Sequence, residues 1–557
     1  MTTPRYLLIC IPILLAASAA AASATAPGDV QTTHDAPCRY PVGLATDGRH
    51  LFVLDWREAR IHQVTTADGK PVKSFAAPTL RPAALTWGDG KLFVGDDHTG
   101  WVYALNVDTG VVEHAFEGPG KRVTGLAYGP DGLYLLERAS GQISKVEPKD
   151  GTILGYCNTP NESCTTLAFD GKYLWAGDRV KNELYMLDPA DGTVINILDA
   201  PGPYVSGLAW LGTHLWAADF QTRKLYQIVV RDAQQKYRLK DTRSARVEFL
   251  WSLYNYGPGE VRDLTVAFAI PDKLPQQELL SELEYGTPPT RIAADRWGQR
   301  CALYEIPRVA AGTRQLLTYS VSAQVSAIRY LIIPDQTGTP ADIPAELRAA
   351  YTQDAPRYRT TSKWAQDTVR SIVGEEQNCY RIARKIYNHV MEKLEYEMVG
   401  GWDVPEVVLK RGKGSCSEYT FAFIALCRAA GLPARYQGSV VVRGDDASID
   451  EAFHRWAEIY LPNYGWVPVD ANRGDAKTPA DQARGFGELA NRFLITTHSG
   501  GPSEFLDWSY NVFARYKLSG YAKVEEENFG VWEPLTPTTA PASGPAGQAA
   551  AECRPVP

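Results

Sequence analysis

The 557-residue chain has no excess of basic residues: 57 Lys and Arg stand against 64 Asp and Glu, and the net charge is −7 at pH 7. Broad binding to a phosphate backbone requires a clustered positive field, so this balance argues against a nucleic acid partner. Charged residues make up 22% and apolar residues 45% of the chain, which excludes a wholly disordered or collagen-like protein. At roughly 100–200 residues per domain, we expect three or more domains.

Beyond its N-terminus, the chain has no apolar run long enough to span a membrane. Residues 6–22 are apolar or small, follow Arg5, and end at Ala22-Ser23-Ala24, the small-x-small pattern of a signal-peptidase site. Pro12 and the Ala- and Ser-rich second half favour a cleaved signal over a transmembrane anchor. We therefore predict a signal peptide over residues 1–24 and a mature protein that is secreted or periplasmic, with no membrane contact.

Cysteine is scarce and lacks the spacing of a metal site. Eight cysteines remain after the predicted signal peptide, too few for a disulfide scaffold of this length, and no Cys-x-x-Cys motif occurs. We expect no metal and no cofactor, and metal binding by the scattered His and Cys residues is a weaker hypothesis. Cys157 and Cys164 bracket a turn-rich loop that a disulfide would close, and both the bridged and the free forms stay open.

The first half of the chain contains a repeat of 41 residues, found by searching for internal self-similarity. Leucine recurs at Leu44, Leu85, Leu126, Leu167 and Leu208. An acidic residue recurs at Asp55, Asp96, Glu137, Asp178 and Asp219. A turn glycine recurs at Gly69, Gly110, Gly151 and Gly192. We expect the acidic residues to cap turns by accepting bonds from the local backbone, rather than to hold a cation or a basic ligand.

Each repeat has the pattern of four short strands joined by tight turns. In the fourth repeat, Asp170-Gly171 and Asp191-Gly192 separate β-rich runs, and Asp-Gly between such runs is a strong hairpin signal. Four strands in about 40 residues are typical of a propeller blade, so we predict a β-propeller over residues 28–235. The fifth repeat lacks its last strand, which residues 28–37 would supply. A sixth blade built from flanking sequence is the alternative.

The rest of the chain divides into four predicted parts. Residues 236–335 contain alternating runs typical of an immunoglobulin-like β-sandwich. Residues 336–362 have the composition of a linker, and residues 363–533 carry helical and strand patterns of an α+β domain. Residues 534–557 are rich in Pro and Ala, and we expect a disordered tail.

The α+β domain contains a candidate nucleophile. Cys416 follows a glycine-rich turn, and Phe421, Ile424, Ala425 and Arg428 recur after it at helical spacing. The unpaired N–H groups and the dipole at a helix N-terminus favour a thiolate, so we expect the pKa of Cys416 to lie below that of a free thiol.

A candidate base and a candidate carboxylate follow on two strand-like runs. His454 begins the first run and Asp470 ends the second. Together with Cys416 they would supply a nucleophile, a base and a group that orients the base.

These residues stand in motifs that resemble the transglutaminase-like superfamily. The matching segments are Gly414-x-Cys416, the run from Cys427 to Arg435, His454-x-Trp456-x-Glu458, and Tyr464-Gly465-Trp466-Val467-x-Val469-Asp470. The resemblance covers about residues 365–500 and implies a papain-like α+β core, with the preceding sandwich resembling a domain that often accompanies it in bacterial members.

The resemblance also implies roles for the individual residues. Cys416 would be the nucleophile, His454 its base, and Asp470 the partner of the other ring nitrogen. The Cys416 N–H is a candidate oxyanion donor. Tyr396 and Trp456 are weaker candidates for oxyanion or substrate contacts.

Two function classes follow from the sequence. The first is an exported cysteine-dependent hydrolase or acyl transferase that acts on amide or peptide bonds through a thioester, with a protein or peptide substrate. Within it we favour hydrolysis over crosslinking, because no acidic calcium-binding loop is evident. The propeller would bind the substrate or a protein partner. The second class is a non-catalytic extracytoplasmic interaction protein that uses the propeller and the sandwich and carries an inactive thiol domain.

Overall fold

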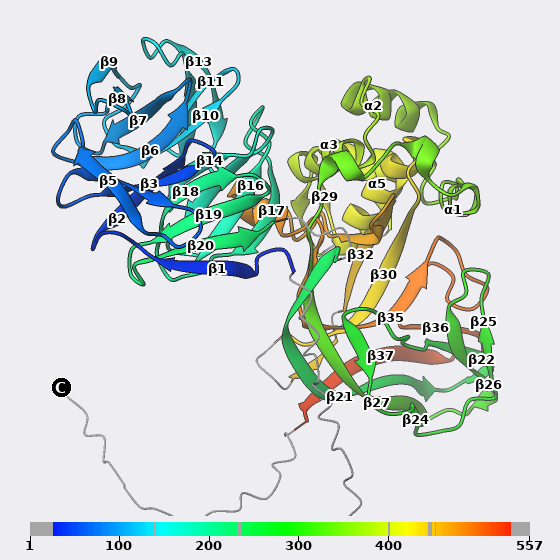
Figure 1. Ribbon diagram of the computed structural model, residues 1–557. Helices are drawn as coiled ribbons and strands as arrows, with labels where there is room; N and C mark the ends of the chain where they lie inside the picture. The colour runs from blue at the N-terminus through cyan, green and yellow to red at the C-terminus, as the bar shows by residue number, and fades with distance from the viewer. Residues whose placement is uncertain are drawn as a thin grey trace, which may run out of the picture.

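The computed structural model describes residues 26–138, 140–230, 235–398, 402–443, 448–451 and 453–535. The predicted signal peptide and nearly all of the predicted tail lie outside these ranges. Figure 1 shows a ring of sheets, a mixed α+β domain beside it and a β-sandwich below. Within the described ranges, no helix is long and apolar enough to cross a membrane.

Five four-stranded antiparallel sheets follow the 41-residue repeat. The first holds β2 (Pro41–Thr46), β3 (His50–Asp55), β4 (Arg60–Thr65) and β5 (Pro71–Ala76). The second holds β6 (Pro82–Gly88), β7 (Lys91–Asp96), β8 (Trp101–Asn106) and β9 (Val112–Glu117). The third holds β10 (Val123–Gly129), β11 (Gly132–Glu137), β12 (Gln142–Val146) and β13 (Ile153–Asn158). The fourth holds β14 (Cys164–Phe169), β15 (Leu174–Asp178), β16 (Glu183–Leu187) and β17 (Val194–Asp199). The fifth holds β18 (Val205–Leu211), β19 (His214–Asp219), β20 (Lys224–Val229) and β1 (Val30–Asp35).

The five sheets close into a ring. Their first strands, β2, β6, β10, β14 and β18, contact one another in order, and β18 contacts β2 again. β1 pairs with the outer strand β20 of the last sheet, so the start of the chain completes the final blade. The ring is therefore a β-propeller of five blades, within the predicted range of five or six, and it is closed by the predicted strand.

The repeated residues explain the local geometry of the blades. The five leucines are buried between neighbouring blades. The four turn glycines have φ angles of 69° to 80°, a left-handed conformation that a side chain would strain. Asp55 Oδ1 accepts the backbone N–H groups of Arg57 and Glu58, each at 2.8 Å, and Asp96, Asp178 and Asp219 accept equivalent pairs. In these four blades the acidic residue caps a turn, as expected.

The β-sandwich is built from two sheets that are far from continuous in sequence. The larger sheet holds β21 (Tyr237–Gly257), β23 (Gln277–Leu279), β24 (Glu284–Tyr285), β27 (Thr313–Tyr330), β31 (Ser448–Asp450), β34 (Glu488–Leu489) and β37 (Lys523–Pro534). The smaller sheet holds β22 (Glu260–Ala269), β25 (Arg291–Ala294), β26 (Arg300–Val309) and β36 (Val512–Ser519).

The sandwich corrects a predicted boundary. β36 and β37 fall in the predicted α+β domain of residues 363–533, but they pair with β22 and β21 of the sandwich. An alternating pattern identifies a segment as a strand and does not say which distant strand it will pair with. The α+β domain is therefore inserted between the strands of the sandwich.

The predicted linker of residues 336–362 is an ordered connector. It contains parts of two 3₁₀ turns, η1 (Pro334–Gln336) and η2 (Pro340–Asp342), and the helix α1 (Ala345–Tyr351). The ring of Tyr351 lies between Trp297 of the sandwich and Trp466 of the α+β domain, with centroid distances of 5.6 and 4.9 Å. The connector thus ties the two domains together through aromatic contacts.

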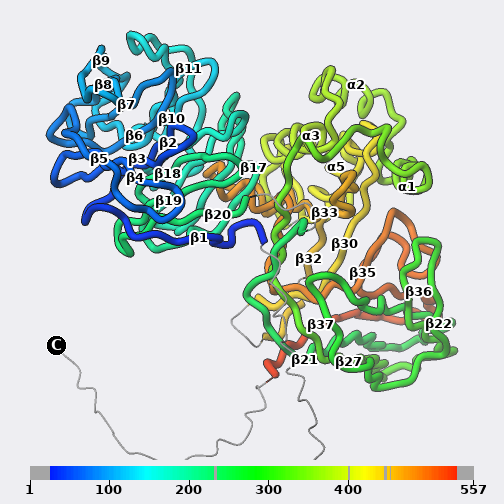
Figure 2. The backbone as a smooth tube through the Cα atoms, viewed as in Figure 1, coloured from blue at the N-terminus to red at the C-terminus, as the bar shows by residue number. Residues whose placement is uncertain are grey.

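In the α+β domain, helices pack on an antiparallel sheet. The sheet runs in the order β33 (Gly465–Val469), β32 (His454–Leu461), β30 (Ala434–Val441) and β35 (Phe493–Ser499). The helices are α2 (Lys363–Val373), α3 (Cys379–Lys393), α4 (Pro405–Arg411) and α5 (Cys416–Ala429). Helices α5 and α3 pack on the sheet, and helices α2 and α4 pack on these two helices. A short helix, α6 (Pro479–Ala483), and the two-residue strands β28 (Glu395–Tyr396) and β29 (Lys413–Gly414) complete it. Helix α5 is buried along almost its whole length, and Figure 2 shows it within the domain.

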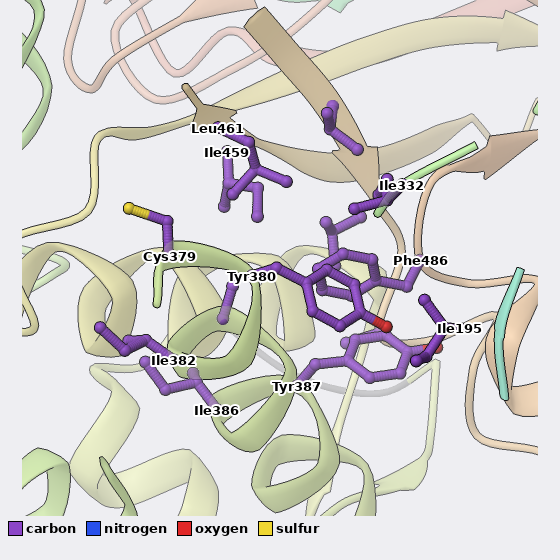
Figure 3. Packing of buried hydrophobic residues seen from close by; sticks show 14 of the residues in the cluster. Ile195, Ile332, Cys379, Tyr380, Ile382, Ile386, Tyr387, Ile459, Leu461 and Phe486 are labelled. Atoms are coloured by element: carbon purple, nitrogen blue, oxygen red, sulfur yellow. The ribbon is translucent and has the colours of Figure 1, made fainter. Parts of the chain in front are cut away.

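The fourth blade of the propeller packs directly on the α+β domain. Ile195 of β17 lies beside Tyr387 and Phe486 in one buried cluster, as Figure 3 shows. The side chain of Asn196 donates to the carbonyl of Ile332 at 2.7 Å and accepts from its N–H at 2.8 Å. Buried apolar contact therefore joins the fourth blade to the α+β domain, and paired polar groups join it to the segment that follows strand β27 of the sandwich.

Candidate active site

Cys416 is the first residue of helix α5, as its position after the glycine-rich turn predicts. Ser415 is the N-cap, and its side chain and that of Glu418 form a reciprocal capping box with the backbone. Glu418 is fully buried and pairs with Arg411 at 2.7 Å. The capping box and this ion pair fix the start of the helix, where the N–H of Cys416 has no acceptor within the helix.

The structure brings His454 and Asp470 to the same end of the helix. His454 begins β32, and Asp470 follows directly on the neighbouring strand β33. The His454 Nε2–H donates to Asp470 Oδ2 at 2.6 Å, while Asp470 Oδ1 accepts the N–H of Arg473 at 3.1 Å. The side chain of His454 also forms a hydrogen bond with Cys416, for which its Nδ1 is the remaining ring nitrogen.

The electrostatics of this trio favour a thiolate and an imidazolium. Burial alone would raise the pKa of Cys416, but the hydrogen bond and charge of His454 and the N–H of Arg455 outweigh it and lower that pKa. Burial would lower the pKa of His454, and the charge and hydrogen bond of Asp470, with the Cys416 contact, raise it instead. The arrangement suits nucleophilic attack followed by proton transfer.

The trio opens onto a cleft of about 550 Å³. Apolar and aromatic walls come from Tyr396, Met398, Trp402, Val441, Phe453, Phe493 and Tyr510. Polar groups come from Ser415, Ser417, Arg443, Glu451, Asn472, Arg473 and Arg492. A volume of this size lies within the range of pockets that bind small molecules.

Comparison with known proteins agrees with this geometry. Residues 366–471 match the family model of the transglutaminase-like superfamily. This part of the chain is a transglutaminase-like domain.

Two curated bacterial proteins are similar to parts of the chain. An uncharacterized protein of Haemophilus influenzae is 34% identical over 125 residues, which cover 18% of this chain and 33% of that protein. The uncharacterized protein YebA of Bacillus subtilis is 31% identical over 81 residues, 13% of this chain and 11% of that protein. The chain thus spans a third or less of the length of these relatives. Among solved structures, a proposed cysteine protease of Cytophaga hutchinsonii is 15% identical, with a TM-score of 0.37, over 53% of this chain and all of that one.

The two weaker candidates of the transglutaminase-like domain occupy different places. Tyr396 is 48% exposed on β28 and lines the cleft, and its pKa is raised by burial and then by the charge of Cys416. Trp456 is fully buried, its Nε1–H donates to Gln437 at 2.7 Å, and its ring packs beside that of His454. Trp456 therefore positions His454, and its N–H is not available to an oxyanion.

Arg455, which stands between His454 and Trp456 on β32, turns away from the cleft. Its fully buried guanidinium lies 4.4 to 4.9 Å from the ring centroids of Tyr510, Tyr436, Trp402 and Phe421. It donates one bond, to the carbonyl of Trp508 at 2.7 Å. The side chain leaves substrate access open and places a fixed positive charge behind Cys416.

Several cleft residues escaped the sequence interpretation, and Tyr510 is the clearest case. Its ring crosses Gly438 of β30 so closely that a Cβ there would lie 2.5 Å from the ring system. Tyr510 stands 94 residues beyond Cys416 in a segment without motif, so only the close approach at Gly438 could have signalled it. Burial and the charge of Cys416 raise the pKa of Tyr510.

Residues of the types that bind metals also lie together in the first propeller blade. Ligand atoms of Cys38, Asp55 and His62 lie within 4.8 Å of one another. The repeat accounts for this contact, because Cys38 stands one 41-residue step before Thr79, whose hydroxyl donates to Asp96, the counterpart of Asp55. Cys157 and Cys164, the candidate disulfide pair, are free buried thiols in the structure.

Proposed function

We propose that the chain is an exported cysteine-dependent enzyme that acts on amide bonds of proteins or peptides through a thioester. The observation that carries the proposal is the hydrogen-bonded series Cys416, His454 and Asp470 at the N-terminus of a buried helix and at the base of a cleft. A free surface thiol lacks both the base and the group that orients it.

The geometry supports a two-stage reaction. The Cys416 thiolate attacks the carbonyl carbon, and the C–N bond breaks as imidazolium His454 passes its proton to the leaving amine. Water then attacks the thioester while His454 takes its proton, the C–S bond breaks, and a carboxylic acid and the Cys416 thiolate are released. An amine in place of water would yield a new amide.

The start of helix α5 supplies the first group that stabilises the intermediate. The N–H of Cys416 has no acceptor within the helix and points along the helix dipole, so it would bind the developing oxyanion. Tyr396, on the cleft wall, is the candidate for a second donor. Asp470 keeps the imidazole in one orientation throughout.

Hydrolysis is the favoured outcome over crosslinking. The sequence carries no acidic calcium-binding loop of the kind found in the enlarged animal crosslinking enzymes. The propeller would bind the substrate or a protein partner, and residues 1–24 would direct the chain to the periplasm or the medium.

Two measurements test the proposal. The rate of Cys416 alkylation by iodoacetamide, followed from pH 4 to 10 by peptide mass spectrometry, should be high well below pH 8 and should fall in His454→Ala. Peptide mixtures incubated in ¹⁸O water with a biotinylated amine should then gain ¹⁸O at new C-termini, whereas transfer would attach the amine. If Cys416 reacts like a free thiol near pH 8.5, the enzyme proposal fails and a non-catalytic interaction protein becomes the better interpretation.

A further inference from the structure

The five blades surround a second cavity, at one end of the propeller axis and distinct from the Cys416 cleft. Its volume is about 280 Å³. The lining residues are Val42, Trp56, Ala83, Asp97, Thr124, Arg138, Thr165, Arg179, Tyr204, Ser206 and Phe220. Every blade contributes at least two of them.

The lining follows the 41-residue repeat but breaks its uniformity. Structural positions keep one residue type in every blade, as the leucine series shows. The position after the second strand instead holds Trp56, Asp97, Arg138, Arg179 and Phe220 in blades one to five. Since blades one and five are neighbours in the ring, the cavity has an aromatic side and a charged side.

The aromatic side is a continuous arc of rings. Tyr40 lies 6.5 Å from Trp56 and 6.0 Å from Phe220, and Phe220 lies 5.3 Å from Tyr204, all between centroids. Trp56 is 42% exposed despite these contacts. An exposed Trp in an aromatic arc at a cavity mouth provides a surface for an apolar group.

The charged side holds buried polar atoms without partners. Arg138 Nε and Asp97 Oδ1 are both inaccessible to solvent and have no hydrogen bond within the described structure. Asp97 is approached by Arg81 and Arg122 at 3.8 and 4.0 Å, which offset its charge. Arg138 lines the cavity and forms no ion pair within the described part of the chain, so its charge is available to an anionic ligand.

Arg179 adds a second cation beside Arg138. It donates to the hydroxyl of Tyr204 at 2.5 Å and lies over that ring at 5.4 Å, which links the charged side to the aromatic arc. Arg138 and Arg179 thus face a small cavity whose single acidic residue is already offset.

We propose that this cavity binds an organic carboxylate that carries an aromatic or branched apolar group. The arginines would hold the carboxylate, since charge-assisted bonds of this kind are strong and directional, and the arc from Trp56 to Tyr204 would hold the apolar group. The carboxylate belongs either to a small free acid or to the C-terminus of a peptide. This site is independent of catalysis at Cys416.

The test is calorimetric titration of the full chain carrying Cys416→Ala, which keeps a peptide probe intact. The probes are N-acetyl-L-phenylalanine and the peptide Ala-Ala-Ala-Phe, each compared with its C-terminal amide. One molecule of a carboxylate should bind per chain at millimolar concentration or below, and each amide should bind at least tenfold more weakly. Binding of both acids would show that the site accepts any terminal carboxylate. Binding of the peptide alone would show that it accepts a peptide C-terminus.

Variants place the site. Arg138→Gln and Arg179→Gln should each weaken binding at least tenfold. Trp56→Ala should remove the preference for the peptide that ends in Phe over the same peptide ending in Ala. The matched control is Arg60→Gln, which removes a cation from strand β4 of the same propeller, outside the cavity lining. The proposal is overturned if neither acid binds, if the amides bind as well as the acids, or if Arg492→Gln in the Cys416 cleft abolishes binding while Arg138→Gln does not.

Discussion

Arg484 of the transglutaminase-like domain donates hydrogen bonds to both carboxylate oxygens of Glu183 in the propeller, at 2.9 and 2.6 Å. Glu183 also accepts the hydroxyl of Tyr185 at 2.8 Å and is 7% exposed. The two residues are 301 positions apart, so the pair exists only when the fourth blade and the segment after Asp470 are docked. It therefore reports on the docking of the two domains.

Loss of this pair should loosen the interface. Arg484→Met leaves the buried Glu183 carboxylate with only the more distant guanidinium of Arg329, at 3.9 Å, and removal of one partner of a buried ion pair destabilises by up to about 3–5 kcal/mol. We expect a lower Tm and faster hydrogen exchange in α6 and β17. The double variant Arg484→Met with Glu183→Gln should recover part of the loss, because the Glu183 charge that lost its closest partner is removed as well. Arg300→Met, in the exposed pair with Asp272, is the control and should change Tm little. Equal exchange in all variants would contradict the docking role.

The pH dependence of Cys416 reactivity should be broad. The thiol pKa is lowered, so thiolate is present above that depressed value and is lost only as pH falls through it. The charge and hydrogen bond of Asp470 and the Cys416 contact raise the pKa of His454 to about 10, so its proton persists through neutral pH and is lost only as pH rises toward that value. Alkylation should thus begin well below pH 8.5, and turnover should fall on the acid side as the Cys416 thiolate is protonated and on the alkaline side as His454 loses its proton. A single rise near pH 8.5 would contradict the ion pair.

Arg455 should tune the thiol through its charge. Its positive charge and backbone N–H both favour the Cys416 thiolate. Arg455→Met keeps the backbone N–H and removes the charge, so the alkylation profile should shift to higher pH. Arg455→Lys keeps the charge and should shift it less. The Met variant should fold, since apolar replacement of a buried charge among aromatic rings is often neutral. An unchanged profile in the Met variant would leave Arg455 with a packing role only.

Asp470→Asn should separate orientation from charge. The amide can still contact His454, but it no longer holds the imidazolium or favours one tautomer, and the equivalent change in a serine-protease triad reduces turnover by about 10⁴. The pKa of His454, followed by NMR, should fall toward its ordinary value. The Tm should stay near that of the parent chain. Parent-like turnover together with a lowered His454 pKa would show that the carboxylate is dispensable for the reaction.

Deletion of residues 523–557 should unfold the sandwich. In the predicted domain map this deletion removes little more than the tail. In the structure, however, β37 pairs with β21 along almost its full length and buries Trp532. Deletion of residues 536–557 is the matched control and leaves every described strand in place. Circular dichroism and limited proteolysis of both chains would decide. Stable folding of the shorter chain would contradict the assignment of β37 to the sandwich core.

Local signals and short motifs were predictable, and long-range pairing was not. The 41-residue step placed the strands of all five blades, because each blade is built from turns such as Asp170-Gly171 that act over a few residues. The three candidate catalytic residues stand in motifs whose spacing is set by one helix and one hairpin. By contrast, β36 pairs with β22, a strand some 250 positions earlier in the chain. Tyr510 lies in the cleft because its ring packs across Gly438. No window of sequence contains that information.

The pairing of β1 with β20 determines when the propeller ring can close during synthesis. Asp35 of β1 pairs with Lys224 of β20 across 189 positions, so β1 leaves the ribosome long before the strand that it pairs with. Until then the blades form an open arc whose two ends both expose unpaired backbone. An arc of this kind can accept the first strand of another copy as readily as its own. Any contact that keeps the newly made strand β1 apart from other chains therefore favours closure of the ring within one chain.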